Sequence, residues 1–266
     1  MYQITSTNNA RIKEVLLLQK KSALRKKKQE FVVEGKREVL LALKNAYQIK
    51  TIFYLPKLIS ENMLLNWKND YHADFELIAV SEKVFKKMAY RQSTEGVIAV
   101  LSMKSHSLNT LSLSNNPLIL VAESVEKPGN IGAMLRTVDG AGADAFVMVN
   151  SVVDLYNPNV IRSSLGTIFS NQIAVVSLDE WAIFIQEKQI KFYTATLQNA
   201  NEYFFNDFTS ATAIAVGAED KGLSDEMRKI AHKSVFVPML GQADSLNVSV
   251  SAAVLLYEAV RQRKME

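Results

Sequence analysis

Polar and charged side chains that could take part in chemistry lie in three turn-rich segments in the second half of the chain. They are Asn130 in segment 127–132, Glu219 in segment 217–224, and Ser245 and Asn247 in segment 238–247, with Arg136 six residues after Asn130. Amide, carboxylate and hydroxyl groups can hold a polar ligand, and a guanidinium group can bind an oxyanion through two parallel hydrogen bonds. Pro238 and Gly241 restrict and bend the backbone of the third segment. We therefore expect these segments to form ligand-binding loops.

The elements around these loops determine whether they can meet. Each loop follows an apolar stretch typical of a buried strand and precedes a stretch with helical periodicity. In an open α/β sheet, ligands bind beyond the carboxyl ends of the strands, so the three loops can converge on one crevice. The alternative is that each loop is an ordinary connection. Asn130, Ser245 and Asn247 would then only cap helices, Glu219 would accept loop amides, and Arg136 would be a solvated helix residue.

Strands alternate with helices along the whole chain, which predicts an α/β protein. In the first half we expect strands at 31–34, 51–55, 75–80 and 96–103, and helices at 8–20, 35–46, 57–67 and 81–88. In the second half we expect strands at 117–122, 145–149, 173–176, 192–195, 211–216 and 234–237, and helices at 133–140, 181–187, 225–231 and from the third loop to residue 260, with a short helix within 154–164. The serine-rich stretch 104–116 is typical of a linker. These features predict domains at 1–105 and 117–266 joined by a linker at 106–116.

Composition excludes several classes of site. The 266 residues include no cysteine, which excludes disulfides, thiolate metal ligands and a cysteine nucleophile. The three histidines, His72, His106 and His232, are widely separated, so we expect no metal site and no serine–histidine triad. No apolar run approaches the roughly 20 residues that span a bilayer, and the N-terminus lacks the apolar core of a secretion signal. We expect a cytoplasmic protein without a membrane partner.

Charge is segregated between the two halves. Residues 1–105 contain 19 Lys and Arg against 10 Asp and Glu, a net charge of +9, whereas residues 106–266 contain 12 against 17, a net charge of −5. A basic half of this kind suits binding to a phosphate backbone, although a solvated basic face is the alternative. Lys26, Lys27 and Lys28, together with Arg162 in the second half, are the candidate RNA-binding residues.

A dinucleotide-binding fold is the competing interpretation of the second half. Gly140-Ala141-Gly142 resembles part of the G-x-G-x-x-G fingerprint. It follows an expected helix and precedes an expected strand, which is the reverse of the order that the fingerprint requires. We reject this interpretation.

The three loops together resemble a known family. Pro128-Gly129-Asn130-Ile131-Gly132-Ala133-Met134-Leu135-Arg136-Thr137, Gly217-Ala218-Glu219-Asp220-Lys221-Gly222-Leu223-Ser224, and Val237-Pro238-Met239 with Ser245-Leu246-Asn247-Val248-Ser249 look like the ordered motifs of the SpoU (TrmH) family of RNA ribose 2′-O-methyltransferases, in the SPOUT superfamily. The match covers about 117–262. The region around Phe31-Val32-Val33-Glu34-Gly35 resembles the substrate-binding domain often fused to this family, which is related to kink-turn-binding ribosomal proteins.

The resemblance implies a fold, a cofactor and roles for the site residues. It implies a C-terminal parallel sheet with helices on both faces and a C-terminal trefoil knot, plus a smaller N-terminal α/β RNA-binding domain. S-adenosylmethionine would bind at the knot of a homodimer whose active site lies near the subunit interface, and no metal would be needed. Arg136 would be catalytic, supported by Asn130, Glu219, Ser245 and Asn247. The cofactor-binding residues would be Gly217, Val237, Met239 and Leu246.

Two residues depart from the family pattern and bear on the substrate. Asp220 stands where many members have glycine, and Lys127 stands where an acidic residue is common. We predict 2′-O-methylation of structured RNA, with ribosomal RNA favoured by the added N-terminal domain. The alternatives are a transfer RNA methyltransferase and a non-catalytic RNA-binding or ribosome assembly factor that retains the fold.

Overall fold

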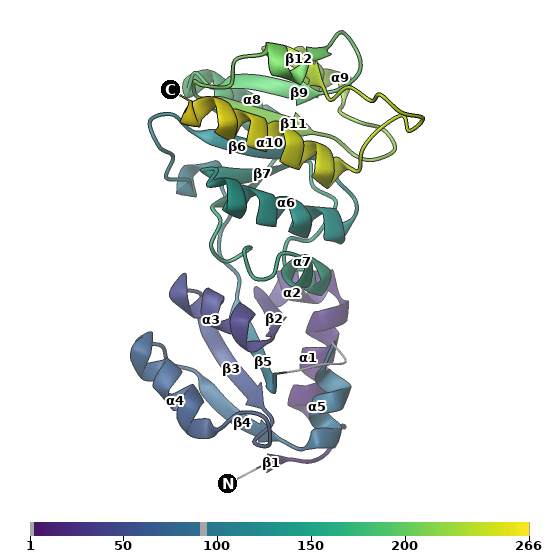
Figure 1. The fold of residues 1–266 in the computed structure, drawn as a ribbon. Coiled ribbons are helices and arrows are strands. Elements are labelled where there is room, and N and C mark those ends of the chain that lie inside the picture. The colour runs from purple at the N-terminus through teal and green to yellow at the C-terminus, as the bar shows by residue number, and fades with distance from the viewer. Residues whose placement is uncertain (1–2, 91–94, 266) are drawn as a thin grey trace. The chain divides into compact units, whose positions relative to one another are not determined.

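The computed structural model describes residues 3–90 and 95–265 and divides into two compact units (Figure 1). Unit 1 consists of Met1–Lys104 and Leu155–Ser170, and unit 2 consists of Ser105–Asp154 and Asn171–Glu266. The chain therefore leaves unit 2 after residue 154 and returns to it at residue 171. Nothing in the composition of segment 155–170 sets it apart from the rest of the second domain that we expected at 117–266.

Unit 1 is built on a mixed sheet. In the described residues its strand order is β1-β4-β3-β5-β2, with β5 antiparallel to both of its neighbours. The elements are β1 (Gln3–Ile4), α1 (Ala10–Lys20), α2 (Ser22–Lys28), β2 (Glu30–Glu34), α3 (Lys36–Lys44), β3 (Ile49–Tyr54), α4 (Glu61–Asp70), β4 (Glu76–Val80), α5 (Glu82–Met88), β5 (Val97–Ser102) and α7 (Pro158–Ser163). The candidate RNA-binding lysines, Lys26, Lys27 and Lys28, lie in the helix α2. Its Arg25 is buried and donates to the Leu18 carbonyl at 2.6 Å, so of the basic residues of this helix only the lysines face solvent.

An aromatic cluster joins segment 155–170 to the rest of unit 1. Tyr156 is buried and stacks on Phe31 with 4.1 Å between ring centroids, and Phe169 meets Tyr47 edge to face at 5.0 Å. The Tyr156 hydroxyl also accepts a hydrogen bond from the Lys104 backbone N–H at 3.1 Å. Because large aromatic rings contribute most of the buried area at such a contact, this segment completes the core of unit 1.

Unit 2 contains a sheet in which every pairing is parallel. Its strand order in the described residues is β10-β12-β9-β11-β6-β7-β8. The elements are η1 (Leu108–Thr110), β6 (Leu118–Glu123), α6 (Pro128–Ala141), β7 (Ala145–Val149), β8 (Ile173–Val176), α8 (Leu178–Glu187), β9 (Lys191–Ala195), β10 (Asn201–Glu202), η2 (Tyr203–Phe205), β11 (Thr212–Val216), α9 (Asp225–Lys229), β12 (Lys233–Phe236) and α10 (Val248–Lys264). The expected α/β class with a parallel sheet and packed helices is confirmed.

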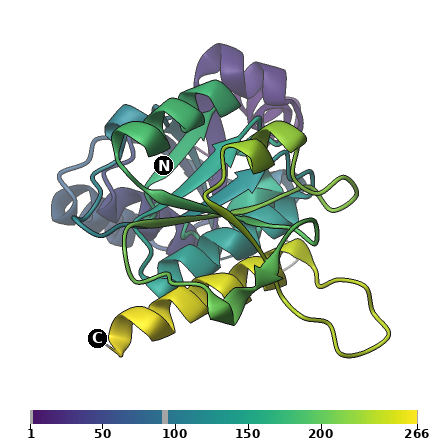
Figure 2. The ribbon, with the colours of Figure 1, turned by 90° about the horizontal axis from the view of Figure 1, so that it is seen from above.

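The two faces of this sheet are covered by different helices, which follows from the alternation of side chains along each strand. On one face Ile119 and Ala213 pack in a core with Trp181 of α8 and Met227 of α9. On the other face α10 packs against α6, β11 and β6. Figure 2 shows α10 running beside α6, with the loop that precedes α10 extending outward. Both helices therefore begin near the loops that the sequence singled out.

The expected linker is part of unit 2 in the structure. Leu108, Leu111 and Leu113 pack against the core that contains Trp181. The serine-rich composition of the stretch hides this spacing of leucines. Within residues 3–90 and 95–265, no helix is both long and apolar enough to cross a membrane.

Candidate active site

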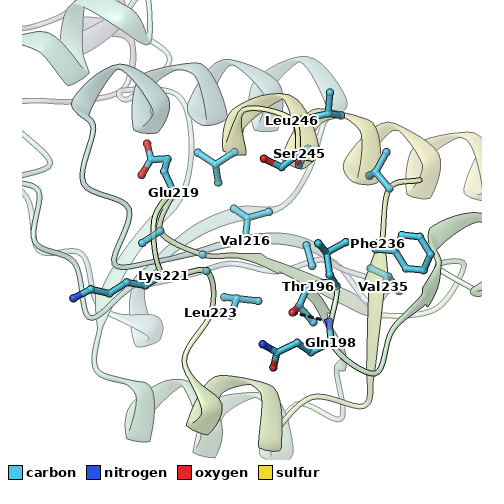
Figure 3. Close-up of a pocket in the computed structure, with 18 of the residues that line it drawn as sticks. Thr196, Gln198, Val216, Glu219, Lys221, Leu223, Val235, Phe236, Ser245 and Leu246 are labelled. Carbon is cyan, nitrogen blue, oxygen red and sulfur yellow. Dashed lines mark hydrogen bonds between the residues drawn. The ribbon is translucent and has the colours of Figure 1, made fainter. Parts of the chain in front are cut away.

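The second and third predicted loops of unit 2 line one cavity of about 580 Å³ (Figure 3). The first predicted loop, 127–132, contributes no residue to the described lining and meets the other two through Asn130. The walls of the cavity come from the segments that follow β9, β11 and β12 and from the first turns of α10; the lining residues include 195–198, 216–223, 235–237, Met239 and 244–248. Figure 3 shows Glu219, Ser245 and Leu246 on one side of the cavity and Thr196 and Gln198 on another. The strands that carry these segments are neighbours and parallel, so their carboxyl ends share one edge of the sheet.

Asn130 connects the three loops. Its side-chain Nδ2 donates a hydrogen bond to Glu219 Oε1, and its Oδ1 accepts one from Asn247 Nδ2 at 3.3 Å. One amide thereby satisfies groups from two segments that lie 89 and 117 residues further along the chain. The structure thus brings together three of the five residues predicted to be catalytic.

The position of Asn130 depends on where α6 begins. We expected a loop up to residue 132 and a helix from Ala133, but α6 begins at Pro128, five residues earlier. Proline is favoured at the first position of a helix because its missing N–H needs no partner there. Asn130 is therefore inside the first turn, and Lys127, not Asn130, is the N-cap residue. The interpretation of Asn130 as the helix cap is wrong.

Glu219 is held on the inner side of the second loop. Only 17% of its side chain is exposed, and Lys127 Nζ lies 3.9 Å from its Oε1. Lys127, one of the two departures from the family pattern, therefore lies beside the predicted site and partly neutralises its carboxylate. Asp220, the other departure, is exposed and also lines the cavity.

The second loop folds back on itself beside Gly217. The Gly222 N–H donates to the Ala218 carbonyl at 2.9 Å, and Gly222 adopts a left-handed conformation with φ of +66°. A Cβ atom at position 217 would lie 2.2 Å from the Gly222 carbonyl carbon. Glycine at 217 is therefore required by close backbone packing in the cavity wall.

Asn247 both caps α10 and contacts the site. Its Oδ1 accepts from the Ser249 N–H at 3.0 Å and from the Ser249 hydroxyl at 2.7 Å, while its Nδ2 reaches Asn130. Asn247 is therefore both a helix cap and a residue of the site, so the two interpretations of this residue are compatible. Ser245 and Leu246 precede it in the cavity wall, and Val237 and Met239 line the same cavity.

Arg136 does not line the cavity within this chain. It is exposed on α6, six residues after Asn130, which is about 9 Å along the helix axis. In the described part of the chain no hydrogen bond or ion pair involves its guanidinium group. The group is thus available to a ligand or a second chain.

The four candidate RNA-binding residues lie in unit 1. Lys26, Lys27 and Lys28 form the last turn of α2 and are exposed, although Lys28 forms an ion pair with Glu14. Arg162 is an exposed residue of α7. Their chemistry suits phosphate contacts.

The sequence did not indicate the segment after β9 as part of the site. Thr196, Leu197 and Gln198 line the cavity, and the Gln198 N–H donates to Thr196 Oγ1 at 3.3 Å. This segment also follows an apolar strand. The sequence did not show that β9 lies between β11 and β12, because the order of strands in a sheet depends on contacts between residues that are far apart in the sequence.

Both parts of the chain match known families. A model of the SpoU rRNA methylase family matches residues 117–257, and a model of the MRM3-like substrate binding domain matches residues 9–99. The chain therefore belongs to the SpoU rRNA methylase family, as the three motifs predicted.

Characterised relatives match over almost the full length. The chain is 30% identical over 257 residues to 23S rRNA (guanosine(2553)-2'-O)-methyltransferase RlmP of Bacillus subtilis, covering 97% of this chain and 98% of that protein. It is 39% identical to a crystal structure of an RNA 2′-O ribose methyltransferase, with a TM-score of 0.83 and coverage of 99% and 100%. It is 29% identical to the AdoMet complex of the SpoU methyltransferase AviRb from Streptomyces viridochromogenes, with a TM-score of 0.88 and coverage of 97% and 100%. The predicted class, an RNA 2′-O-methyltransferase that uses S-adenosylmethionine, is confirmed.

The cavity fits S-adenosylmethionine by size and charge. Its volume of about 580 Å³ lies within the usual range for small-molecule sites. Acidic lining residues outnumber basic ones, which favours a cationic sulfonium group: the acids are Glu219, Asp220 and Asp244, and the bases are Lys221 and Arg228. Leu246 adds apolar surface. Within the described ranges, no group of three or more histidine or acidic residues is placed to hold a metal ion.

Proposed function

We propose that this protein methylates the 2′-hydroxyl of a ribose in ribosomal RNA. The single observation that carries this proposal is the Asn130 amide, which joins Glu219 and Asn247 at a cavity that fits the methyl donor. Ribosomal RNA is favoured because RlmP of Bacillus subtilis, which matches over nearly the whole chain, is a 23S rRNA enzyme. The match of the first half to an MRM3-like substrate binding domain also supports an RNA substrate. A cytoplasmic location belongs to the same proposal, because the proposed substrate is ribosomal RNA.

The residues of the site would act mainly by positioning the reactants. S-adenosylmethionine, when bound, supplies a methyl group activated by its sulfonium sulfur. The ribose oxygen must lose its proton as it bonds to the methyl carbon, so groups that hold it in line and stabilise its negative charge lower the barrier. Asn130, Glu219, Ser245 and Asn247 keep the loops of the cavity in place. Gly217, Val237, Met239 and Leu246 would contact the cofactor.

Arg136 would stabilise charge on the RNA. With a pKa above about 12 it is a poor base, but its planar group can bind the neighbouring phosphate and the 2′-oxygen together. Its exposure on α6 and its lack of partners in the described residues support this role.

We also propose that the protein acts as a homodimer with the active site near the subunit interface. Arg136 does not line the cavity of its own chain, and in the proposed dimer the second subunit supplies this residue. Val250 and Tyr257, which are 46% and 50% exposed on the helix that packs against α6, offer apolar surface for such an interface. Sedimentation as a monomer at enzyme concentrations that support turnover would contradict this proposal.

A trefoil knot at the carboxyl end is part of the same proposal. After β12, which pairs with β9, the chain returns through 237–247 to pack α10 on α6 and β6, and this course is compatible with threading through a loop. An electron-density map in which segment 238–247 passes outside every loop of unit 2 would contradict the proposed knot.

The function is tested with Arg136→Ala. Transfer of labelled methyl groups to ribosomal RNA should fall by about a hundredfold or more, the usual effect of removing a group that stabilises transition-state charge. The affinity for S-adenosylmethionine, measured by calorimetry, should stay within about twofold of the wild type, because the residue lies outside the cavity. Arg261→Ala, which removes an exposed arginine paired with Glu258, serves as the control and should keep full activity. Retained methylation by Arg136→Ala would refute the role.

RNA binding by unit 1 is tested separately. Replacing Lys26, Lys27 and Lys28 with glutamine should weaken RNA binding and lower the slope of log affinity against log salt by about two, since each phosphate contact contributes about 0.7–0.9. The matched control replaces three lysines that already have carboxylate partners: Lys50, Lys57 and Lys68. Equal effects of the two triple variants would show that only net charge matters and that α2 is not an RNA contact.

A further inference from the structure

Glu123 is a buried acid whose role the predicted site does not explain. It is the last residue of β6, only 3% of it is exposed, and it does not line the cavity. In the described residues no lysine, arginine or histidine forms an ion pair with it. Since burying a carboxylate is costly unless hydrogen bonds compensate, its partners indicate what it does.

Both carboxylate oxygens of Glu123 are bound by one residue, Ser224. Glu123 Oε2 accepts from the Ser224 backbone N–H at 2.8 Å, and Oε1 accepts from the Ser224 hydroxyl at 2.6 Å. Ser224 Oγ in turn accepts from the Met227 N–H at 3.1 Å and caps α9. Hydrogen bonds to a charged acceptor are stronger than neutral ones, so this pair fixes the end of segment 217–224.

The same segment is also held near its beginning. Glu219 is bound by Asn130, so both ends of the segment are attached to residues of β6 and α6, more than 85 residues away in sequence. Between these attachments Leu223 is buried, and its carbonyl accepts from Arg228 Nη1 at 2.6 Å. The backbone of 219–223, which lines the cavity, is thus held between two side-chain attachments.

We propose that Glu123 is a positioning residue for the methyl-donor site: by holding Ser224 it keeps segment 217–224 in the conformation that binds S-adenosylmethionine. This inference rests on the proposed function of the cavity. Glu123 acts only through Ser224. Without its carboxylate the Ser224 N–H and hydroxyl lose their acceptor in a partly buried place, and the segment gains conformations that do not fit the ligand.

The test is the affinity of the isolated full-length protein for S-adenosylmethionine, measured by calorimetry. Glu123→Ala should raise Kd about tenfold or more, because two charge-assisted hydrogen bonds are lost. Glu123→Gln should restore most of the affinity, since its amide can accept from the Ser224 N–H and donate to Oγ. Amide hydrogen exchange without ligand should accelerate at 218–224 in Glu123→Ala.

Two further variants separate positioning from stability. Gln262→Ala removes a partly buried side chain that bonds Phe208 N–H and the Asn206 carbonyl, away from the cavity, and should lower Tm without changing Kd. If Glu123→Ala does not fold, Ser224→Ala takes its place: it should raise Kd severalfold, and combining it with Glu123→Gln should add less than the sum of the two effects.

The outcomes are distinct. Wild-type protein that does not bind S-adenosylmethionine would sink the proposed function. Wild-type protein that binds, with Kd unchanged in Glu123→Ala and in Ser224→Ala, would overturn only the role of Glu123. An unchanged rate of amide hydrogen exchange at 218–224 in Glu123→Ala would also overturn the role of Glu123.

Discussion

Replacing Gly217 with alanine tests whether the second loop must close tightly on itself to bind the methyl donor. The added Cβ would lie 2.2 Å from the Gly222 carbonyl carbon, 2.3 Å from its oxygen and 2.4 Å from the Leu223 nitrogen. Ordinary contact begins at 3.4 Å, so the backbone at 222–223 must move by more than 1 Å. Leu223 is only 2% exposed and anchored in the core, which opposes this movement.

The cost follows from two effects. Overpacking in a well-packed region costs about 1–3 kcal/mol. Opening the loop also removes the Gly222 to Ala218 hydrogen bond, worth about 0.5–1.5 kcal/mol. Because S-adenosylmethionine binding requires the closed loop, most of this free-energy cost should weaken binding, and Kd should rise about tenfold to a hundredfold.

Calorimetry measures this change, and Gly129→Ala provides the control. Gly129 lies in the first turn of α6. Apart from its neighbours in the chain and the backbone of its own helix, no atom of the described residues lies within 4 Å of a Cβ placed there, so alanine fits. Gly129→Ala should leave Kd unchanged and slightly raise Tm, since alanine is favoured over glycine in a helix. Binding by Gly217→Ala within twofold of the wild type, or an equal loss in both variants, would refute the close-packing explanation.

Other predictions concern stability. Tyr156→Ala should destabilise unit 1 by about 3–5 kcal/mol in a denaturant titration, because it empties a buried stack on Phe31. Phe205→Ala, at a side chain that is 76% exposed, should cost far less, and similar costs would mean that segment 155–170 is not part of the core. Hydrogen bonds from Thr209, helped by Lys191, lower the pKa of Asp207 to about 2 from its usual 3.8. The carboxylate therefore contributes stability above pH 4 that is lost as pH falls from about 4 to about 2. Asp207→Asn should flatten the pH dependence of Tm between these two pH values. A pH profile of Tm that does not change would contradict the lowered pKa of Asp207.

Local patterns predicted most elements of the fold. Apolar runs located the strands of both sheets except the two-residue strands β1 and β10, and glycine and proline located the loops of the site. The largest error at the site was the start of α6, because Pro128 was interpreted as part of a turn although it also suits the first position of a helix. The leucines of 108–113 were hidden in a serine-rich stretch, and segment 155–170 showed no local sign that it packs in unit 1.

The sequence by itself determined which residue types stand at each loop, the basic character of the first half and, through three ordered motifs, the family. The tertiary structure decided that Asn130 bonds Glu219 and Asn247, that Thr196 and Gln198 line the cavity, and that Glu123 holds Ser224. The physical reason is that helix and strand periodicity depend on neighbours a few residues apart. The site depends instead on the order of β9, β11 and β12 in the sheet and on hydrogen bonds between residues about 90 to 120 positions apart, which no local pattern encodes.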